Sequence, residues 1–156
     1  MRGTFKMVTD TATLCLYDLA ALKHRTQDTS DWWSIPEDEL AEVNAGHCLF
    51  LNLGADGAYE VEWSLEEDAE VGSGPDYVAE REKVYHLQVP SGEVFLGAAE
   101  DVSGGELEPD ETCEGVLLQL KPGNYACIIS REASRIAIVL KPSIQGINML
   151  DELIRI

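Results

Sequence analysis

The chain has 156 residues, of which 45% are apolar, and this length and composition suit one folded domain with a buried core. Its 29 acidic residues outnumber its 11 basic residues, which gives a net charge of −18 at pH 7. Nucleic acid and anionic membrane surfaces bind positively charged faces, so this charge argues against both as partners. We therefore expect a single domain over residues 1–156 that attracts cationic partners.

Other features of the sequence predict a cytoplasmic location. No apolar stretch approaches the roughly 20 residues that cross a membrane, and the N-terminus lacks the apolar run of a secretory signal. The four cysteines, at positions 15, 48, 113 and 127, form no Cys-x-x-Cys pair, and three of them lie in apolar runs. We expect buried, reduced thiols rather than disulfides.

The first predicted strand covers residues 11–17, where apolar residues alternate with others. Asp18 follows it and is placed to cap a short helix. After a polar loop, a second helix is predicted to begin at Pro36, because the fixed φ of proline suits the first helical position. Its first turn is acidic, as the helix dipole favours, and Gly46 is expected to end it.

Two adjacent tryptophans, Trp32 and Trp33, precede this second helix. Neighbouring side chains of an extended backbone point to opposite sides, so both rings cannot be deeply buried there. We expect both to pack around the start of the helix, and a ring left exposed would be an anchor for a partner.

A β-hairpin is predicted over residues 48–63. An apolar run comes first, followed by Asp56 and Gly57, which tolerate the positive φ of a tight turn. The second run alternates, so that Tyr59 and Trp63 share a face expected to be buried.

Further strands and turns fill the second half of the chain. Strands 83–89 and 93–99 are predicted to form a second hairpin around a Pro-Ser-Gly turn, and strands 115–120 and 125–129 flank a Lys-Pro-Gly-Asn turn. A further turn leads into strand 135–140. The last residues, from 144 onward, fit either a helix or an extended segment.

Two acidic loops interrupt this pattern, at residues 65–82 and 100–114. Each contains seven carboxylates, and Arg81 is the one basic residue in either loop. A loop of mixed charge is equally soluble with less self-repulsion, so we interpret these loops as an interaction surface. The residues assigned to its acidic part are Glu66, Glu67, Asp68, Glu70, Glu106, Glu108, Asp110 and Glu111.

The expected fold is mainly β, an antiparallel β-sandwich or jelly-roll-like double sheet with two or three short helices. Seven or eight strands are predicted, with turns at short intervals. A doubly wound α/β fold needs repeated helices of about a dozen residues between strands, and the sequence lacks them.

Motifs of catalysis and cofactor binding are absent from the sequence. It contains no Walker loop, no Gly-x-Gly-x-x-Gly and no Gly-x-Ser-x-Gly. His24, His47 and His86 are too scattered to predict a histidine metal site. The many carboxylates leave a calcium ion and a scattered acid–base pair open. We expect a protein that is not an enzyme and that holds no cofactor.

Four segments carry a resemblance to known proteins: residues 31–36 (DWWSIP), 42–46 (EVNAG), 53–61 (LGADGAYEV) and 120–125 (LKPGNY). They resemble segments of small bacterial β-proteins, which are similar in size and charge to immunity proteins encoded beside secreted antibacterial toxins, including type VI secretion effectors. The resemblance implies a protein that binds a cognate toxin and blocks its active site. The shared motifs are structural turns, so no binding residue is carried over.

On this hypothesis the acidic loops occupy a basic cleft of the toxin, such as that of a nuclease, by charge complementarity. Trp32, Trp33 and Tyr77 are the candidate anchors. The alternative is a carbohydrate-binding β-sandwich without catalysis, which stacks sugars on Trp32, Trp33 or Trp63. An enzyme with a scattered carboxylate site ranks third, because no nucleophile–base pair is visible in the sequence.

Overall fold

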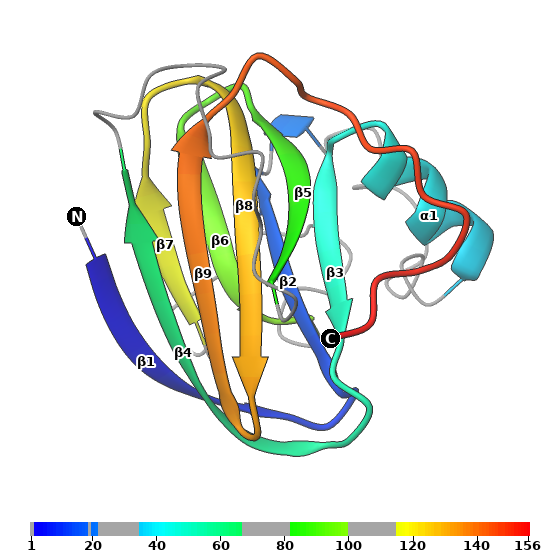
Figure 1. Cartoon of the computed structure of the whole chain (residues 1–156), viewed down its shortest axis with the longest axis vertical. Helices are drawn as coiled ribbons and strands as arrows, with labels where there is room; N and C mark the ends of the chain where they lie inside the picture. The colour runs from blue at the N-terminus through cyan, green and yellow to red at the C-terminus, as the bar shows by residue number, and fades with distance from the viewer. Residues whose placement is uncertain (1, 19, 22–34, 67–81, 100–114) are drawn as a thin grey trace.

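The protein is a two-layer β-sandwich with one α-helix packed beside it, shown by a computed structural model that describes residues 2–18, 20–21, 35–66, 82–99 and 115–156 (Figure 1). In chain order the elements are β1 (Arg2–Thr9), β2 (Thr13–Asp18), α1 (Pro36–Asn44), β3 (Cys48–Asn52), β4 (Gly57–Leu65), β5 (Glu82–Val89), β6 (Glu93–Ala98), β7 (Gly115–Gln119), β8 (Gly123–Glu132) and β9 (Arg135–Pro142). The predicted fold class is confirmed.

The strands form two sheets. One has five strands in the order β1-β4-β9-β8-β5, and the other has four in the order β3-β2-β6-β7. All paired strands are antiparallel except β4 and β9, which are parallel. Within the described residues there are nine strands, one or two more than predicted.

The two predicted hairpins are wrong in their pairing, although their strands exist. β3 pairs with β2 and β4 pairs with β1 and β9, so residues 53–56 carry the chain from one sheet to the other. The turns between β5 and β6 and between β7 and β8 also change sheets. A short turn rich in Gly, Pro and Asp suits a sheet change as well as a hairpin, so its local chemistry does not determine which strands pair. The predicted turn between β8 and β9 does form a hairpin.

Strand β1 was not predicted, because the sequence pattern placed the first strand at residues 11–17. Its inward side is weakly apolar: Met7 is buried and Phe5 half-buried, but the next inward position is Gly3. The ring of Trp63 fills that position, since a Cβ added to Gly3 would lie 2.9 Å from ring atoms. Trp63 is therefore half-buried against the core, as its alternation with Tyr59 predicted.

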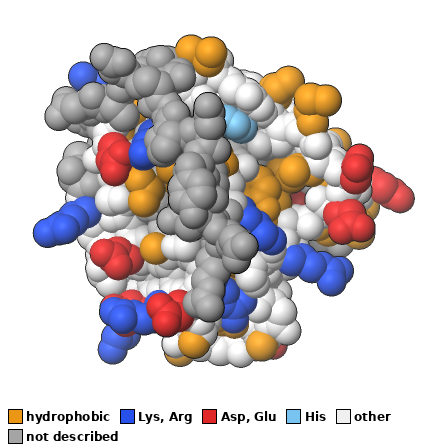
Figure 2. All heavy atoms as spheres, in the orientation of Figure 1, with side chains coloured by type: hydrophobic (Ala, Val, Ile, Leu, Met, Phe, Trp, Pro, Cys, Tyr) orange, Lys and Arg blue, Asp and Glu red, His pale blue; other side chains and the backbone are white. Residues whose placement is uncertain are grey.

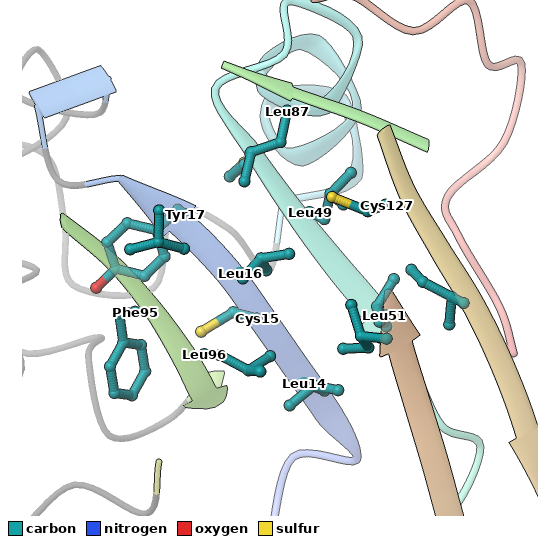
Figure 3. Close-up of a cluster of buried hydrophobic side chains, with 14 of the residues drawn as sticks. Leu14, Cys15, Leu16, Tyr17, Leu49, Leu51, Leu87, Phe95, Leu96 and Cys127 are labelled. Carbon is teal, nitrogen blue, oxygen red and sulfur yellow. The ribbon is translucent and has the colours of Figure 1, made fainter. Parts of the chain in front are cut away.

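The core lies between the two sheets, and strands β2, β3 and β6 of the four-stranded sheet are buried at nearly every position, whereas β7 is partly exposed. Leu14 and Leu16 of β2 point to the side opposite Cys15 and Tyr17, and the Tyr17 ring lies 6.0 Å from that of Phe95 (Figure 3). Cysteines 15, 48 and 127 are buried and unbridged, as expected, whereas position 113 lies outside the described residues. Burial raises the pKa of the Cys127 thiol, which keeps it protonated.

Asp18 caps the backbone after β2 as predicted, and it also binds a distant turn. Its carboxylate accepts the N–H of Ala20 at 2.9 Å. It further accepts the N–H of Ser91 at 2.8 Å, the Ser91 hydroxyl at 2.7 Å and the N–H of Gly92 at 3.1 Å. The end of β2 is thereby joined to the β5–β6 connection. The predicted helix after Asp18 extends into residues outside the described ranges.

The predicted helix at Pro36 is confirmed as α1, which has nine residues with Pro36 in its first turn. Gly46 follows it with φ +81°, and a Cβ there would clash with the carbonyl oxygen of Gly146. In the described part of the chain, no helix is long and apolar enough to cross a membrane.

Candidate partner-binding surface

The chain after β9, residues 143–156, is extended rather than helical. We call it the C-terminal segment. It runs beside α1 and along the side of the sandwich where β5 and β3 are the edge strands (Figure 1). Its one strand-like contact is a parallel bridge between Arg155 and Asn52. Side chains from both sheets hold its backbone in place, as follows.

Asn148 is the central contact of the C-terminal segment and is only 7% exposed. Its side-chain oxygen accepts the N–H of His86 at 2.8 Å, and its side-chain nitrogen donates to the carbonyl of His86 at 2.9 Å. The same nitrogen donates to Val43 O at 2.8 Å, and the Asn148 N–H donates to Asn44 O at 2.9 Å. One amide side chain thus joins the edge strand β5 to the end of α1.

Two further amides fix the chain on either side of Asn148. Asn44 donates to Leu150 O at 3.1 Å and accepts the Leu150 N–H at 2.8 Å. Gln88 of β5 donates to both Ala45 O and Gly146 O, each at 3.0 Å. In an extended segment without such contacts, these backbone groups would hydrogen-bond to water. Here they hydrogen-bond to side chains of the protein, so the segment is held in one conformation.

The end of the C-terminal segment is bound to β3 and β8. Asn52 donates its N–H to Ile154 O at 3.0 Å and accepts the Ile156 N–H at 3.1 Å. Arg131 donates to Ile156 O at 2.9 Å and to Leu53 O at 2.6 Å, and its guanidinium lies 5.3 Å from the ring centre of Tyr59.

Between these contacts the C-terminal segment exposes three large apolar side chains, which we call the apolar row. Ile144 is 77% exposed, Ile147 50% and Met149 89%. Exposed hydrophobic side chains gather on this part of the surface, with carboxylates next to them (Figure 2). Large exposed apolar side chains on a fixed backbone are candidate contacts for another protein.

The surroundings of the apolar row are acidic. Glu37 of α1 and both Asp151 and Glu152 of the C-terminal segment are exposed. Residues 35–47 contain no Lys or Arg, and Arg155 is the one basic residue of residues 143–156. Carboxylates therefore accompany the apolar row, while the basic side chains of Lys83 and Arg131 contact the end of the segment at Arg155 and Ile156.

Titratable side chains are buried beneath this surface. Nδ1 of His47 lies 2.6 Å from a carboxylate oxygen of Glu42, which is buried. Burial lowers the pKa of His86, and its Nδ1 is buried without a hydrogen-bond partner among the described residues. Nowhere in the described ranges do three or more His, Cys, Asp or Glu side chains gather in a way that suits a metal ion. These titratable groups beneath the surface are therefore a pair, His47 with Glu42, and a separate His86.

Glu39 of α1 gives a pH-dependent prediction. It is 4% exposed, and burial raises its pKa from 4.5 to about 7. Between these two values the unfolded chain loses the proton that the folded chain keeps, so stability falls as the pH rises. We expect Glu39→Gln to unfold like the parent at pH 4.5 and to be about 1–2 kcal/mol more stable at pH 8. Urea unfolding across this range measures the difference.

Glu37→Gln is the matched control, because Glu37 lies in the same helical turn but is exposed. It should stay within about 0.5 kcal/mol of the parent at both pH 4.5 and pH 8. A Glu39→Gln difference that is constant from pH 4.5 to 8 would show that this carboxyl ionises as readily in the folded chain as in the unfolded one.

A family model described as a family of unknown function, DUF6386, matches residues 1–156. The chain belongs to this family. No curated protein sequence matches the chain. The comparisons with solved structures therefore supply what is known of related folds.

Two solved structures resemble this DUF6386 protein. One, described as crocagin biosynthetic gene J, is 14% identical with a TM-score of 0.55, and the match covers 91% of this chain and 98% of that one. The other is ComJ from Bacillus subtilis, described as an inhibitor of the DNA-degrading activity of NucA. It is 11% identical with a TM-score of 0.50, and the match covers 90% of this chain and 94% of ComJ. At these identities the similarity shows a shared fold.

Of the eleven partner-binding residues predicted from the sequence, Glu66 falls in the described part. It is exposed after the end of β4, and its carboxylate lies 3.1 Å from Nζ of Lys141, so a lysine partly neutralises it. The others lie outside the described residues and stay predictions: Trp32, Trp33, Glu67, Asp68, Glu70, Tyr77, Glu106, Glu108, Asp110 and Glu111.

The apolar row was missed by the sequence prediction. The spacing of Ile147, Leu150 and Ile154 left a helix and an extended segment both open, and the structure shows an extended segment in which Ile147 is exposed and Ile154 is buried. The useful signal was the short alternation Ile147-Asn148-Met149, which is typical of an extended segment with its polar residue inward.

Proposed function

We propose that this DUF6386 protein is an inhibitor that binds another protein and blocks its active site. The observation that carries the proposal is the apolar row of Ile144, Ile147 and Met149 on an immobilised segment. A segment whose backbone is already held in position loses little backbone entropy when a partner covers it. A few such anchors supply most of the free energy of a protein interface.

The charge of the chain supports a basic partner. A net charge of −18 steers a cationic protein toward the inhibitor and accelerates association. Glu37, Asp151 and Glu152 lie where such a partner would meet the apolar row. The acidic loops at 65–82 and 100–114 remain our candidates for a second, electrostatic part of the interface.

The proposed target is a toxin with a basic active-site cleft, such as a nuclease, which makes this chain an immunity protein. A nuclease cleft binds phosphates with positive charge, and carboxylates can occupy the same positions. The fold shared with ComJ, an inhibitor of a DNA-degrading activity, supports this target class. The resemblance of several segments to small bacterial β-proteins supports an antibacterial toxin.

The test is to purify the products of the genes that adjoin this one and to assay each for DNA or RNA cleavage with and without the protein. We expect one enzyme to be inhibited at a one-to-one ratio. The double variant Ile147→Asp with Met149→Asp should bind it about 100-fold more weakly, because two anchors become charged. Titration calorimetry gives the dissociation constants.

Leu117→Asp is the control, since Leu117 is an equally exposed apolar residue, at 50%, on the opposite side of the sandwich. It should leave the dissociation constant within about twofold of the parent. Inhibition that both variants retain would remove the apolar row from the interface. If none of the purified products binds at low or high salt, the inhibitor function itself is wrong.

A further inference from the structure

The two sides of the sandwich differ in how their edge strands are covered. On one side α1 and the C-terminal segment satisfy the edges of β5 and β3, for example through Gln88 N–H to Gly46 O at 2.8 Å. On the other side the edges are β1 and β7. Within the described residues, nothing but β4 hydrogen-bonds to the backbone of residues 2–8. Figure 1 shows β1 at the outer margin of its sheet, away from α1.

The hydrogen-bond pattern shows which backbone groups of β1 point outward. Glu60 and Glu66 donate their N–H groups to carbonyls at β9, at 2.8 and 2.9 Å. The even residues of β4 thus face β9 and the odd residues face β1, because successive residues of a strand point to opposite sides. The β1 partners of those odd residues are Gly3, Phe5 and Met7. The N–H and C=O groups of the even residues of β1 therefore point to the free edge.

The same even residues carry a basic, exposed set of side chains. Arg2, Thr4, Lys6 and Val8 are all exposed, and Val8 is 57% exposed. β1 contains no carboxylate, although the whole chain carries −18. The carboxylates on the same face are those of Glu60 and Glu62 on β4, opposite Lys6 and Thr4 on the inner side of the edge. Neither Arg2 nor Lys6 is in an ion pair with another described residue.

We propose that the free edge of β1 binds an extended protein segment that carries carboxylates, by adding it as a sixth strand to the five-stranded sheet. Backbone hydrogen bonds supply affinity, and the side chains on the outer face supply specificity. In an antiparallel addition, the residues opposite Arg2 and Lys6 are four positions apart on the added strand. Glutamates there meet two cations, and an apolar residue two positions further meets Val8.

The charges argue against a second copy of this chain as the occupant. Antiparallel pairing of two β1 strands brings each Arg2 and Lys6 near those of the partner, between two chains of −18 each. Exposed lysine on an edge strand also serves in many proteins to prevent such pairing. If Lys6 only prevents pairing, an acidic strand should not bind to β1. The proposal predicts that it does bind.

The experiment uses the whole chain and two synthetic eight-residue peptides of alternating Val and Thr, with Glu or with Lys at the two positions that face Arg2 and Lys6. Amide NMR shifts are followed during each titration at low salt. We expect the Glu peptide to bind at least tenfold more tightly than the Lys peptide and to shift the amides of β1. The double variant Arg2→Glu with Lys6→Glu should reverse this preference.

Thr4→Pro keeps the ladder to β4, because the Thr4 N–H points outward, but it blocks the edge. It should fold and bind neither peptide. Equal binding of both peptides, no binding, or shifts located away from β1 would overturn the proposal. A dimer of the parent chain that Thr4→Pro dissociates would also overturn it, since the occupant would then be a second copy.

Discussion

Replacing Asp18 with Ala should destabilise the fold by about 4 kcal/mol, the largest effect that we expect of a single change. The carboxylate is fully buried and accepts four hydrogen bonds, three from backbone N–H groups and one from the Ser91 hydroxyl. Alanine leaves four donors without their acceptor, and the Gly92 N–H is buried, so water cannot readily replace the carboxylate there. Urea unfolding at pH 7 measures the change.

Two variants separate the hydrogen bonds from the mere loss of an acidic residue. Asp18→Asn keeps the shape but replaces one accepting oxygen with a donor, so we expect about half of the full effect. Asp56→Ala removes an exposed carboxylate and should change the stability by less than about 0.5 kcal/mol. If Asp18→Ala and Asp56→Ala are equally stable, water replaces the carboxylate and the account of this site is wrong.

Asp18 also illustrates what the sequence could and could not predict. Its position directly after an alternating run indicated a capping residue, because capping depends on neighbours in the chain. Its bonds to Ser91 and Gly92 join residues 73 and 74 positions apart. No local sequence pattern predicts a hydrogen-bond partner so far away in the chain. The same carboxylate both caps the chain after β2 and binds the turn at Ser91 and Gly92.

Most strands were predictable from apolar runs or alternation, but β1 was not, and neither was the pairing of the strands. β3 is apolar at almost every position because one face meets the core and α1 packs beside it, and this pattern gives no preferred partner. The sequence of the tight turn at Gly57 predicts a hairpin, which is the commonest use of such a turn. Here the turn connects the two sheets instead. Which strands pair depends on how the two sheets bury their apolar faces against each other, not on the turn itself.

The candidate surface was less predictable than the fold. The distribution of charge predicted an interaction surface on the acidic loops. Most of the partner-binding residues predicted in those loops lie outside the described ranges. The apolar row has few residues, and each looks like an ordinary core residue in the sequence. The exposure of Ile147 and Met149 follows from Asn148, whose buried amide turns these two neighbours outward. A single buried polar residue therefore decides which side of the C-terminal segment faces solvent.

This dependence leads to the second large prediction. Asn148→Ala removes three side-chain hydrogen bonds and leaves the backbone N–H and C=O of His86 without their partner. We expect a loss of about 3 kcal/mol in the free energy of unfolding. Amide hydrogen exchange in residues 143–150 should accelerate more than exchange in the core strands, because the segment is released from β5 and α1.

Asn148→Asp gives the sharper test, since it preserves the size of the side chain. An ionised carboxylate still accepts the His86 N–H but faces the carbonyl oxygens of Val43 and His86, to which Asn148 donates. It should therefore destabilise the fold at pH 7 at least as much as Ala. Protonation restores one donor, and a carboxyl in this position has a pKa raised above its unfolded value, so the difference from the parent should shrink as the pH falls to 4.

Gln145→Ala is the matched control, because this amide is exposed and donates one hydrogen bond within the same segment, to Ile147 O. It should cost no more than about 0.5 kcal/mol and leave hydrogen exchange unchanged. If Asn148→Asp is as stable as the parent at pH 7, the amide does not hold the segment and the apolar row is not pre-organised. A partner would then have to order residues 143–150 on binding, and the tight, stoichiometric inhibition proposed above would have to overcome that entropy cost.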